Sequence, residues 1–490
     1  MLSQRVRQLS RPDNLPFHLA VAASAGLLLG VASLWFSPLW TLIALAGAGL
    51  AFASLKRPEI ALLGILIATS SIVFEDRLPL IPIGIGSLHI PDVFLLASLG
   101  LIILRWLVEP DFKIVRTPLD CPLLIFYGVA LLSTLRAIFQ SSVEAQTGVR
   151  AIRIVSYYLT FFIVTNLVRQ DRQRRFLLRG LFFLANIVAV AMVIQFLLGK
   201  SVPVLPGRVE TLLTQGTRYG GITRILPPGQ SLILVAFIVT SVTLILDRFR
   251  PIDMLRILQW SLLGLALVLT FSRASWMGTT LALFLLAYLL RRQGGQRLVG
   301  LGLVVTFLAA MILLVVLARP ESQVARLASS SIERLSTVMG GKLFMDSSFR
   351  WRYAEYEYAL PQVVSHPLLG LGLGARYRPF DARLDYEFFD GRAYVHNGHL
   401  WVLLKTGLLG YGGLLWLSLA FLIRGFKYWR GVPDPTVGGV ILGFTLTYST
   451  VLIAAVVSPV FREWFWTPVI GLMMGLNEVI LRDSVPREVT

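Results

Sequence analysis

Cysteine, histidine and charged residues are all scarce in this 490-residue chain. The single cysteine is Cys121, so an intrachain disulfide is impossible and a cysteine-based metal site is not expected. Only 15% of the residues are charged, whereas about 25% are charged in soluble proteins. The nucleotide-binding pattern GxxxxGKS or GxxxxGKT is missing and charges are rare inside the apolar runs, which argues against an energy-coupled pump.

Hydrophobic sequence is what the chain has in excess. The hydrophobic residues make up 56% of the total, and the mean hydropathy is +0.72. They recur in runs of about 15–24 residues, the length that a helix needs to cross a bilayer. The pattern predicts an all-α polytopic membrane protein with about 14 transmembrane helices. The predicted spans are 15–36, 38–55, 60–74, 91–108, 121–139, 154–168, 176–198, 228–246, 257–271, 274–290, 298–318, 398–423, 437–457 and 464–481.

The distribution of basic residues sets the predicted orientation. The net charge is +18, and arginines that flank membrane helices bind lipid headgroups and mark the cytoplasmic side. This explanation is preferred to nucleic-acid binding, since no compact basic fold is evident. With an even number of spans before Arg169, all the short basic clusters fall on one side. The sequence therefore predicts both termini in the cytoplasm, with an uncleaved first helix after the first 14 residues.

The predicted spans and loops divide the chain into three parts. Residues 1–318 hold eleven spans with short loops, 319–396 form a large external loop, and 397–490 hold the last three spans and a cytoplasmic tail. A connection of this length is expected to be functional, because it is not low in hydrophobic residues. Segment 322–340 has apolar residues near helical spacing and is predicted to lie on the membrane surface. A second helix is predicted from the cap-type residues 346–348 toward Pro361.

Two of the five histidines stand where the chain returns to the membrane. His396 is predicted at the outer end of a span, where a neutral imidazole can accept a proton from an attacking hydroxyl; the alternative is an interfacial histidine. Asn397 is predicted to be the N-cap of the next helix. His399, three residues beyond His396, is predicted to share its helical face, and Lys405 to line the bundle interior. No third ligand stands nearby, so no metal is expected.

Arginines form the second candidate group. Guanidinium groups bind phosphate oxygens with two parallel hydrogen bonds and keep their charge. Several that converge from separate external loops would form a diphosphate site; the alternative for each is an interfacial or ion-paired arginine, such as Arg350 with Glu357. Arg462 and Glu463 are interpreted as structural or interfacial. The candidates for phosphate binding are Arg218, Arg224, Arg273, Arg350 and Arg352.

Four fragments in a fixed order resemble a known family. They read "TRYGGITRILPPGQSLIL", "LTFSRASWMG", "SFRWRYAEYEYALPQVVSHPLLGLGLG" and "VHNGHLWVLLKTGLLG". In this order the chain resembles the O-antigen ligase and O-antigen polymerase superfamily over roughly residues 200–425. Each fragment alone is weak evidence, and the ordered set is more specific.

The resemblance implies a membrane glycosyltransferase of the C-type class. It would move a glycan from undecaprenyl diphosphate to an acceptor hydroxyl, the lipid A–core sugar of lipopolysaccharide for a ligase, at the periplasmic face of the bacterial inner membrane. Such transfer would be metal-independent and inverting, with no cofactor. His396 would be the base or acceptor-orienting residue, and Arg350 would bind the diphosphate, with Arg218 or Arg224 as a partner and Arg352 in reserve. The lipid tail would occupy a groove near the glycines at 370, 372 and 374.

Two alternatives stay open at this point. A polymerase of the same superfamily would lengthen the glycan on its lipid carrier instead of moving it to a separate acceptor. A membrane protein related to bicarbonate transport is the alternative from another functional class. The size of the product distinguishes a polymerase from a ligase. Movement of a solute without sugar transfer would indicate a transport protein.

Overall fold

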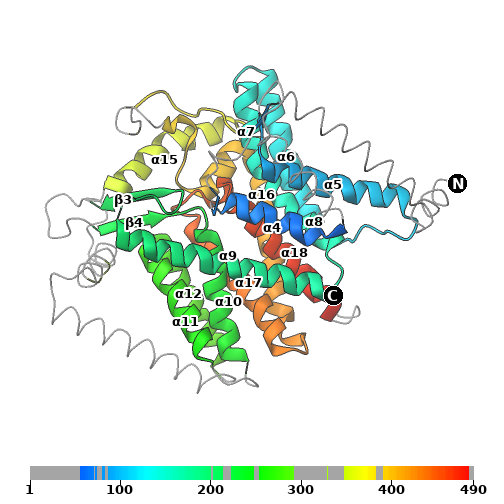
Figure 1. The fold of residues 1–490 in the computed structure, drawn as a ribbon. Helices are drawn as coiled ribbons and strands as arrows, with labels where there is room; N and C mark the ends of the chain where they lie inside the picture. The colour runs from blue at the N-terminus through cyan, green and yellow to red at the C-terminus, as the bar shows by residue number, and fades with distance from the viewer. Residues whose placement is uncertain are drawn as a thin grey trace, which may run out of the picture.

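The computed structural model describes residues 56–70, 72–73, 80–82, 87–199, 202–212, 222–247, 253–291, 328, 331, 347–381, 384 and 390–484. Within these ranges the chain is almost entirely helical, and the strands found there form two short antiparallel hairpins (Figure 1). The predicted helical class is therefore confirmed for the described part of the chain.

The elements follow one another along the described ranges. The helices are α4 (Pro58–Thr69), α5 (Ile90–Val108), α6 (Asp120–Phe139), α7 (Ala145–Ser156), η3 (Tyr157–Leu159), α8 (Thr160–Leu167), α9 (Asp171–Leu198), α10 (Gln230–Leu246), α11 (Met254–Leu269), α12 (Arg273–Leu290), α15 (Ser347–Ser365), η5 (Gly391–Ala393), α16 (Gly398–Tyr428), η6 (Trp429–Gly431), α17 (Pro435–Ala454), η7 (Val460–Arg462) and α18 (Thr467–Ser484). The hairpins pair β1 (Ile81–Pro82) with β2 (Ser87–Leu88), and β3 (Arg208–Leu212) with β4 (Ile222–Leu226).

Seven segments of the described chain are long and apolar enough to cross a membrane. They are Ile90–Val108, Asp120–Phe139, Ala145–Leu167, Asp171–Leu198, Arg273–Leu290, Gly398–Gly431 and Pro435–Ala454. Helices α4, α10 and α11 are apolar but shorter. Three of the predicted spans, 15–36, 38–55 and 298–318, lie outside the described residues, and each of the others overlaps a helix. The protein is an integral membrane protein; the number fourteen stays a prediction.

Helices α10 and α17 form the centre of the bundle. Nearly every residue of α10 and most residues of α17 are buried, which is what a helix that is hydrophobic all round requires. Small residues bring the two helices close together: a methyl group built on Gly443 would meet Val239 at 2.8 Å. Hydroxyls inside this core bond to their own helix, as Thr447 Oγ1 does to Gly443 O at 2.8 Å. The core therefore holds polar hydroxyls without unpaired donors at these positions.

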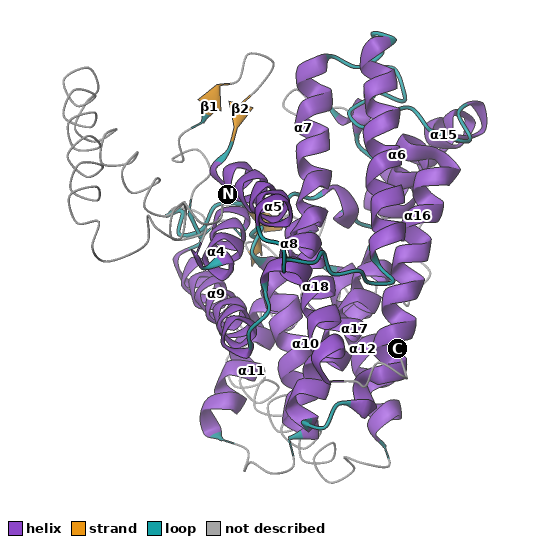
Figure 2. Ribbon diagram, turned by 90° about the vertical axis from the view of Figure 1, so that its right-hand side faces the viewer, coloured by secondary structure: helices purple, strands orange, loops and turns teal. Residues whose placement is uncertain are grey.

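Helix α16 joins the two ends of the bundle. It has 31 residues, and at roughly 1.5 Å per residue it is longer than a hydrocarbon core of about 30 Å. At its start Gly398 N donates to Ala455 O, just after α17, at 2.7 Å. Near its last turn Arg424 pairs with Glu478 of α18. We call these the His396 end and the Arg424 end; α15 lies beside the half of α16 that contains the His396 end (Figure 2).

Basic residues from separate helices gather at the Arg424 end. Arg174 of α9 pairs with Asp483 of α18 at 3.0 Å, and Arg430 Nη2 donates to Leu289 O of α12 at 3.3 Å. The antiparallel alternation of the helices thus brings together charges that are far apart in the sequence. This arrangement agrees with the predicted concentration of positive charge on one side of the membrane.

The glycine-rich segment after α15 supplies hydrogen-bond partners where α16 is interrupted. Gly407 has φ 64° and ψ −168°, so the helix is interrupted there. Backbone groups of α16 near the break bond to the glycine-rich segment instead. Gly372 N donates to Lys405 O at 2.9 Å, and Leu408 N donates to Pro367 O at 2.7 Å. Inside a membrane, backbone groups that leave a helix need such partners. The segment after α15 is therefore part of the bundle core.

This packing corrects the role assigned to the glycines at 370, 372 and 374. They allow close approach, but the neighbour is the protein itself. A methyl group built on Gly370 would meet Gly407 N at 2.6 Å, and one built on Gly372 would meet Ala137 Cβ of α6 at 2.6 Å. The predicted groove for a lipid tail is thus filled by α16 and α6.

We expect Gly370→Ala to destabilise the protein strongly. Gly370 has φ 63°, which costs an alanine roughly 1–2 kcal/mol, and the added methyl group would also clash with the backbone of α16. Gly412→Ala is the matched control, because Gly412 is exposed on the same helix with open space around it. Thermal unfolding in detergent should show a lower Tm for Gly370→Ala alone. Equal Tm values for the two variants would contradict the role of Gly370.

Candidate functional site

A histidine and a buried glutamate form the centre of the site. Helix α15 places Glu355 against His396, which lies in the irregular segment between η5 and α16. The Nδ1 atom of His396 lies 2.7 Å from Glu355 Oε1, and the backbone N–H of His396 donates to Oε2 at 2.9 Å. The glutamate side chain is 3% exposed and the histidine side chain 25%. Because a carboxylate only accepts, Nδ1 carries the proton of the neutral ring and Nε2 is left as the basic nitrogen.

Aromatic rings fix the plane of the imidazole. Tyr394 meets the His396 ring edge to face at 4.8 Å between centroids, and Trp351 of α15 meets it at 5.5 Å. Such contacts limit rotation of the ring, as does the hydrogen bond from Nδ1. The orientation of Nε2 is therefore fixed by three separate neighbours.

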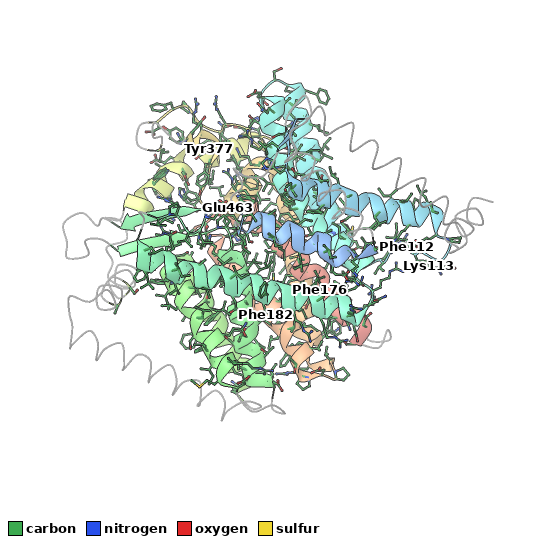
Figure 3. All side chains as sticks on the ribbon, in the orientation of Figure 1. Phe112, Lys113, Phe176, Phe182, Tyr377 and Glu463 are labelled. Atoms are coloured by element: carbon green, nitrogen blue, oxygen red, sulfur yellow. The ribbon has the colours of Figure 1, made fainter. Side chains whose placement is uncertain are left out.

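The loop between α17 and α18 adds two charged residues. The guanidinium carbon of Arg462 lies 4.8 Å from the centre of the Tyr394 ring. Burial raises the pKa of the neighbouring Glu463 carboxyl, and the positive charge of Arg462 opposes that rise. Burial also raises the pKa of the Tyr394 phenol, and the charge of Glu463 adds to the effect. Figure 3 shows Glu463 on the same side of the molecule as Tyr377, and Phe112 and Lys113 on the other side.

Arg352 and Arg350 both belong to the first half of α15. Arg352 Nη2 donates to Val457 O at 3.1 Å, which ties α15 to the loop after α17. Arg350 precedes Trp351, so its backbone lies next to a residue that contacts the imidazole. The structure therefore brings the arginine helix and His396 together.

The other predicted arginines lie on neighbouring elements. Arg224 is on β4, and its Nε donates to Thr270 O at the end of α11 at 3.1 Å. Arg273 is the first residue of α12. This helix runs along α17, where Thr450 Oγ1 donates to Gly278 O at 3.1 Å. Both arginines thus belong to the His396 end, and Arg218 lies outside the described residues.

Asn397 and His399 hold the start of α16 in place. Asn397 Oδ1 accepts from Leu400 N at 3.0 Å, so Asn397 is the N-cap, and its Nδ2 donates to Tyr356 OH of α15 at 2.6 Å. His399 Nε2 lies 3.0 Å from Leu452 O. The helix begins only at Gly398, so the expected common helical face of the two histidines is wrong.

Lys405 is completely buried, two residues before the break in α16 at Gly407. Its ammonium donates to Ala375 O, and its nitrogen lies 5.6 Å from the centre of the Tyr377 ring. Both partners belong to the segment that follows the glycines. The lysine thus attaches this segment to the bundle.

Sequence reasoning missed Glu355 and undervalued Arg462 and Glu463. Glu355 and Glu357 alternate with tyrosines in "YAEYEY", and nothing in that pattern marks which carboxylate is buried. The adjacent Arg462 and Glu463 stand in an aromatic, apolar stretch, which is the one signal that could have drawn attention to them. Among the described residues, no group of three or more histidine, cysteine or acidic side chains is placed to hold a metal ion.

Fold and site define the class: a polytopic helical membrane protein with a histidine–carboxylate pair and nearby arginines at one end of its bundle. Residues 260–417 match the family model described as O-antigen ligase. The resemblance to the O-antigen ligase superfamily is therefore confirmed, over a matched segment that is shorter than the one predicted and leaves out the hairpin with Arg224. No curated protein matches the chain.

Proposed function

We propose that the protein is an O-antigen ligase-like glycosyltransferase that moves a glycan from a lipid diphosphate to an acceptor hydroxyl. The observation that carries the proposal is the hydrogen bond between Glu355 and Nδ1 of His396 inside the family-matched segment. It leaves Nε2 of a partly exposed imidazole as a base, which is what activation of a hydroxyl needs.

The reaction can be written with this pair in place. The acceptor hydroxyl gives its proton to Nε2 of His396 while its oxygen attacks the anomeric carbon of the glycan. The new C–O bond forms as the bond to the phosphate oxygen breaks on the opposite face, so the configuration inverts. Glu355 stabilises the imidazolium that forms. The leaving diphosphate takes the bonding electrons, and the imidazolium later returns its proton to water.

Fixed cations compensate the charge that develops on the leaving diphosphate. Arg350 and Arg352 on α15 are the first candidates, with Arg224 and Arg273 from the neighbouring elements and Arg218, which lies six residues before Arg224 in the sequence. Arg462 joins them, because its guanidinium lies over Tyr394, whose ring contacts His396. No metal or cofactor takes part in this scheme.

The proposed donor is a glycan linked to undecaprenyl diphosphate, and the proposed acceptor is the lipid A–core sugar. The His396 end would face the periplasm and the Arg424 end the cytoplasm, with both termini cytoplasmic in the inner membrane. The gathering of basic residues at the Arg424 end supports this orientation. The architecture proposed is that of a C-type glycosyltransferase, whose active site faces the exterior.

Reconstituted transfer tests the proposal. Purified protein is given a lipid-diphosphate-linked glycan and lipid A–core acceptor, with and without EDTA. We expect one glycan to move intact to the acceptor, with inverted configuration and an unchanged rate in EDTA, because His396 and the arginines supply the base and the cations. A ladder of longer glycans on the lipid carrier would identify a polymerase instead. Solute uptake into liposomes without any sugar transfer would reject both enzymes.

A further inference from the structure

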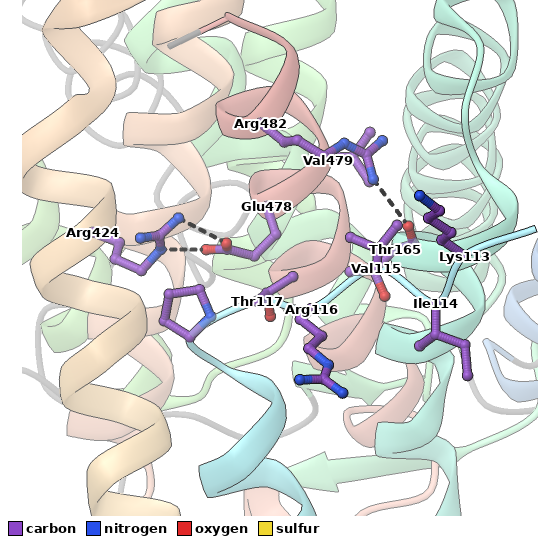
Figure 4. Close-up of a pocket in the computed structure, with 11 residues that line it drawn as sticks. Lys113, Ile114, Val115, Arg116, Thr117, Thr165, Arg424, Glu478, Val479 and Arg482 are labelled. Carbon is purple, nitrogen blue, oxygen red and sulfur yellow. Dashed lines mark hydrogen bonds and ion pairs between the residues drawn. The ribbon is translucent and has the colours of Figure 1, made fainter. Parts of the chain in front are cut away.

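A second cationic cluster surrounds a cavity at the Arg424 end of the bundle. The cavity has a volume of about 380 Å³ and lies between the segment before α6 and the last turns of α16 and α18 (Figure 4). Its lining contains four cationic side chains and one carboxylate: Lys113, Arg116, Arg424, Arg482 and Glu478. The proposed transfer chemistry at the His396 end uses none of them.

The single carboxylate is already engaged. Glu478 accepts two parallel hydrogen bonds from Arg424, at 2.8 Å from Nε and 2.9 Å from Nη2. Arg482 donates to Thr165 O at 3.2 Å and contacts Asp483 at 3.1 Å (Figure 4). One side of the cavity is thus held rigid by ion pairs and hydrogen bonds, and both carboxylate oxygens of Glu478 accept from Arg424.

The rim carries two cations of a different kind. The side chains of Lys113 and Arg116 are exposed and form no hydrogen bond or ion pair with the rest of the described chain. Arg116 attracts the Asp120 carboxylate electrostatically without a hydrogen bond. The Asp120 carboxylate accepts its hydrogen bonds from Thr117. These two positive charges at the mouth of a cavity favour an anion.

The backbone of the rim is fixed before any ligand binds. Val115 N donates to Asn166 Oδ1 at 2.8 Å, and Arg169 Nη2 donates to Lys113 O at 2.9 Å. The guanidinium of Arg169 also lies 4.4 Å from the centre of the Phe112 ring. A segment held at several points loses little conformational freedom when it binds a ligand.

Exposed apolar side chains continue from the rim along the outer face of α5. Trp106 is 56% exposed, Leu107 69% and Ile114 of the cavity lining 46%. In a membrane protein such a surface contacts lipid tails, and tryptophan is typical of the headgroup level. The positive charge at the cavity and the apolar surface beside it are complementary to a molecule that has a phosphate group and acyl chains.

We propose that this cavity binds the phosphate ester headgroup of an anionic membrane lipid. Lys113 and Arg116 hold the phosphate oxygens at the rim, Arg482 adds charge from the inner side, and the acyl chains lie along α5. Basic pockets between membrane helices are suited to anionic headgroups in this way. The ligand chemistry is shared with free phosphate, and the lipid-facing apolar surface distinguishes the two sources.

The test uses the exposed Cys121 at the start of α6, three residues after Pro118 of the cavity lining. A fluorophore on Cys121 of the full chain in detergent reports titrations with dioctanoyl phosphatidylglycerol, dioctanoyl phosphatidylcholine and inorganic phosphate. We expect saturable binding of phosphatidylglycerol that weakens with salt. The double change Lys113→Gln with Arg116→Gln should raise its Kd roughly tenfold or more.

The matched control removes two other exposed positive charges from the same end. Arg172 and Arg175 on α9 do not line the cavity, so changing both to Gln should leave the Kd close to that of the unmodified protein. An equal loss in the control pair would show diffuse charge attraction and overturn the site. Equal affinity for phosphatidylcholine would also overturn it. Saturable binding of inorganic phosphate at the same concentrations would overturn the lipid proposal and identify the ligand as a soluble anion.

Discussion

Replacing His396 by alanine should lower kcat for glycan transfer by about a thousandfold, within the range that a positioned general base contributes. Alanine cannot accept the proton of the acceptor hydroxyl. The remaining rate would come from donor binding and from the arginines, which stay in place. A radiolabelled glycan on the lipid carrier, with product separated by gel electrophoresis, measures the loss.

His366→Ala is the control for this variant. His366 is an exposed histidine just after α15, and its Nδ1 lies 3.3 Å from the carbonyl oxygen of Gln362 in that helix. We expect transfer at the unmodified rate. A His396→Ala protein that folds and transfers within about threefold of the unmodified rate would exclude imidazole as the base.

Replacing Glu355 by glutamine should lower kcat by about a hundredfold or more while KM for the lipid-linked donor changes little. Glutamine keeps the shape of the side chain but loses the charge that stabilises the imidazolium, and it can present an N–H to Nδ1 and favour the wrong tautomer. Glu355 is a positioning residue in this scheme, because it acts through His396. Initial rates over a range of donor concentrations separate kcat from KM.

Glu357→Gln gives the matched control, since Glu357 is exposed two residues further along the same helix. It should leave both kcat and KM unchanged. Thermal unfolding of all three proteins in detergent separates chemistry from stability. A Glu355→Gln protein with normal kcat would contradict the positioning role, and equal losses in both variants would assign the effect to α15 as a whole.

Much of the fold was predictable because membrane spans depend on local composition. Runs such as 121–139 and 398–423 each need a helix whatever surrounds them, since a backbone in hydrocarbon must satisfy its own hydrogen bonds. The helix after residues 346–348 was predicted from its cap residues and begins at Ser347. It continues through Pro361 and ends at Ser365, shortly before the glycines in which the prediction had it end.

The hairpin of β3 and β4 and the break in α16 were not predicted. Both depend on partners that are distant in the sequence. Nothing in "HLWVLLKTGLLG" marks Gly407 as a break rather than an ordinary helical glycine, because the bonds that replace the helical ones come from residues 367–372.

The sequence by itself determined that this is a helical membrane protein that resembles the O-antigen ligase superfamily, with His396 as the first candidate base. Hydropathy, charge bias and motif order are properties of neighbouring residues, so they can be read along the chain. Only the tertiary structure decided that Glu355 rather than Glu357 faces the imidazole, that the glycines pack on α16, and that Arg462 joins the site. Those outcomes depend on which helix faces meet, and the free energy of such contacts is shared among segments that no local pattern connects.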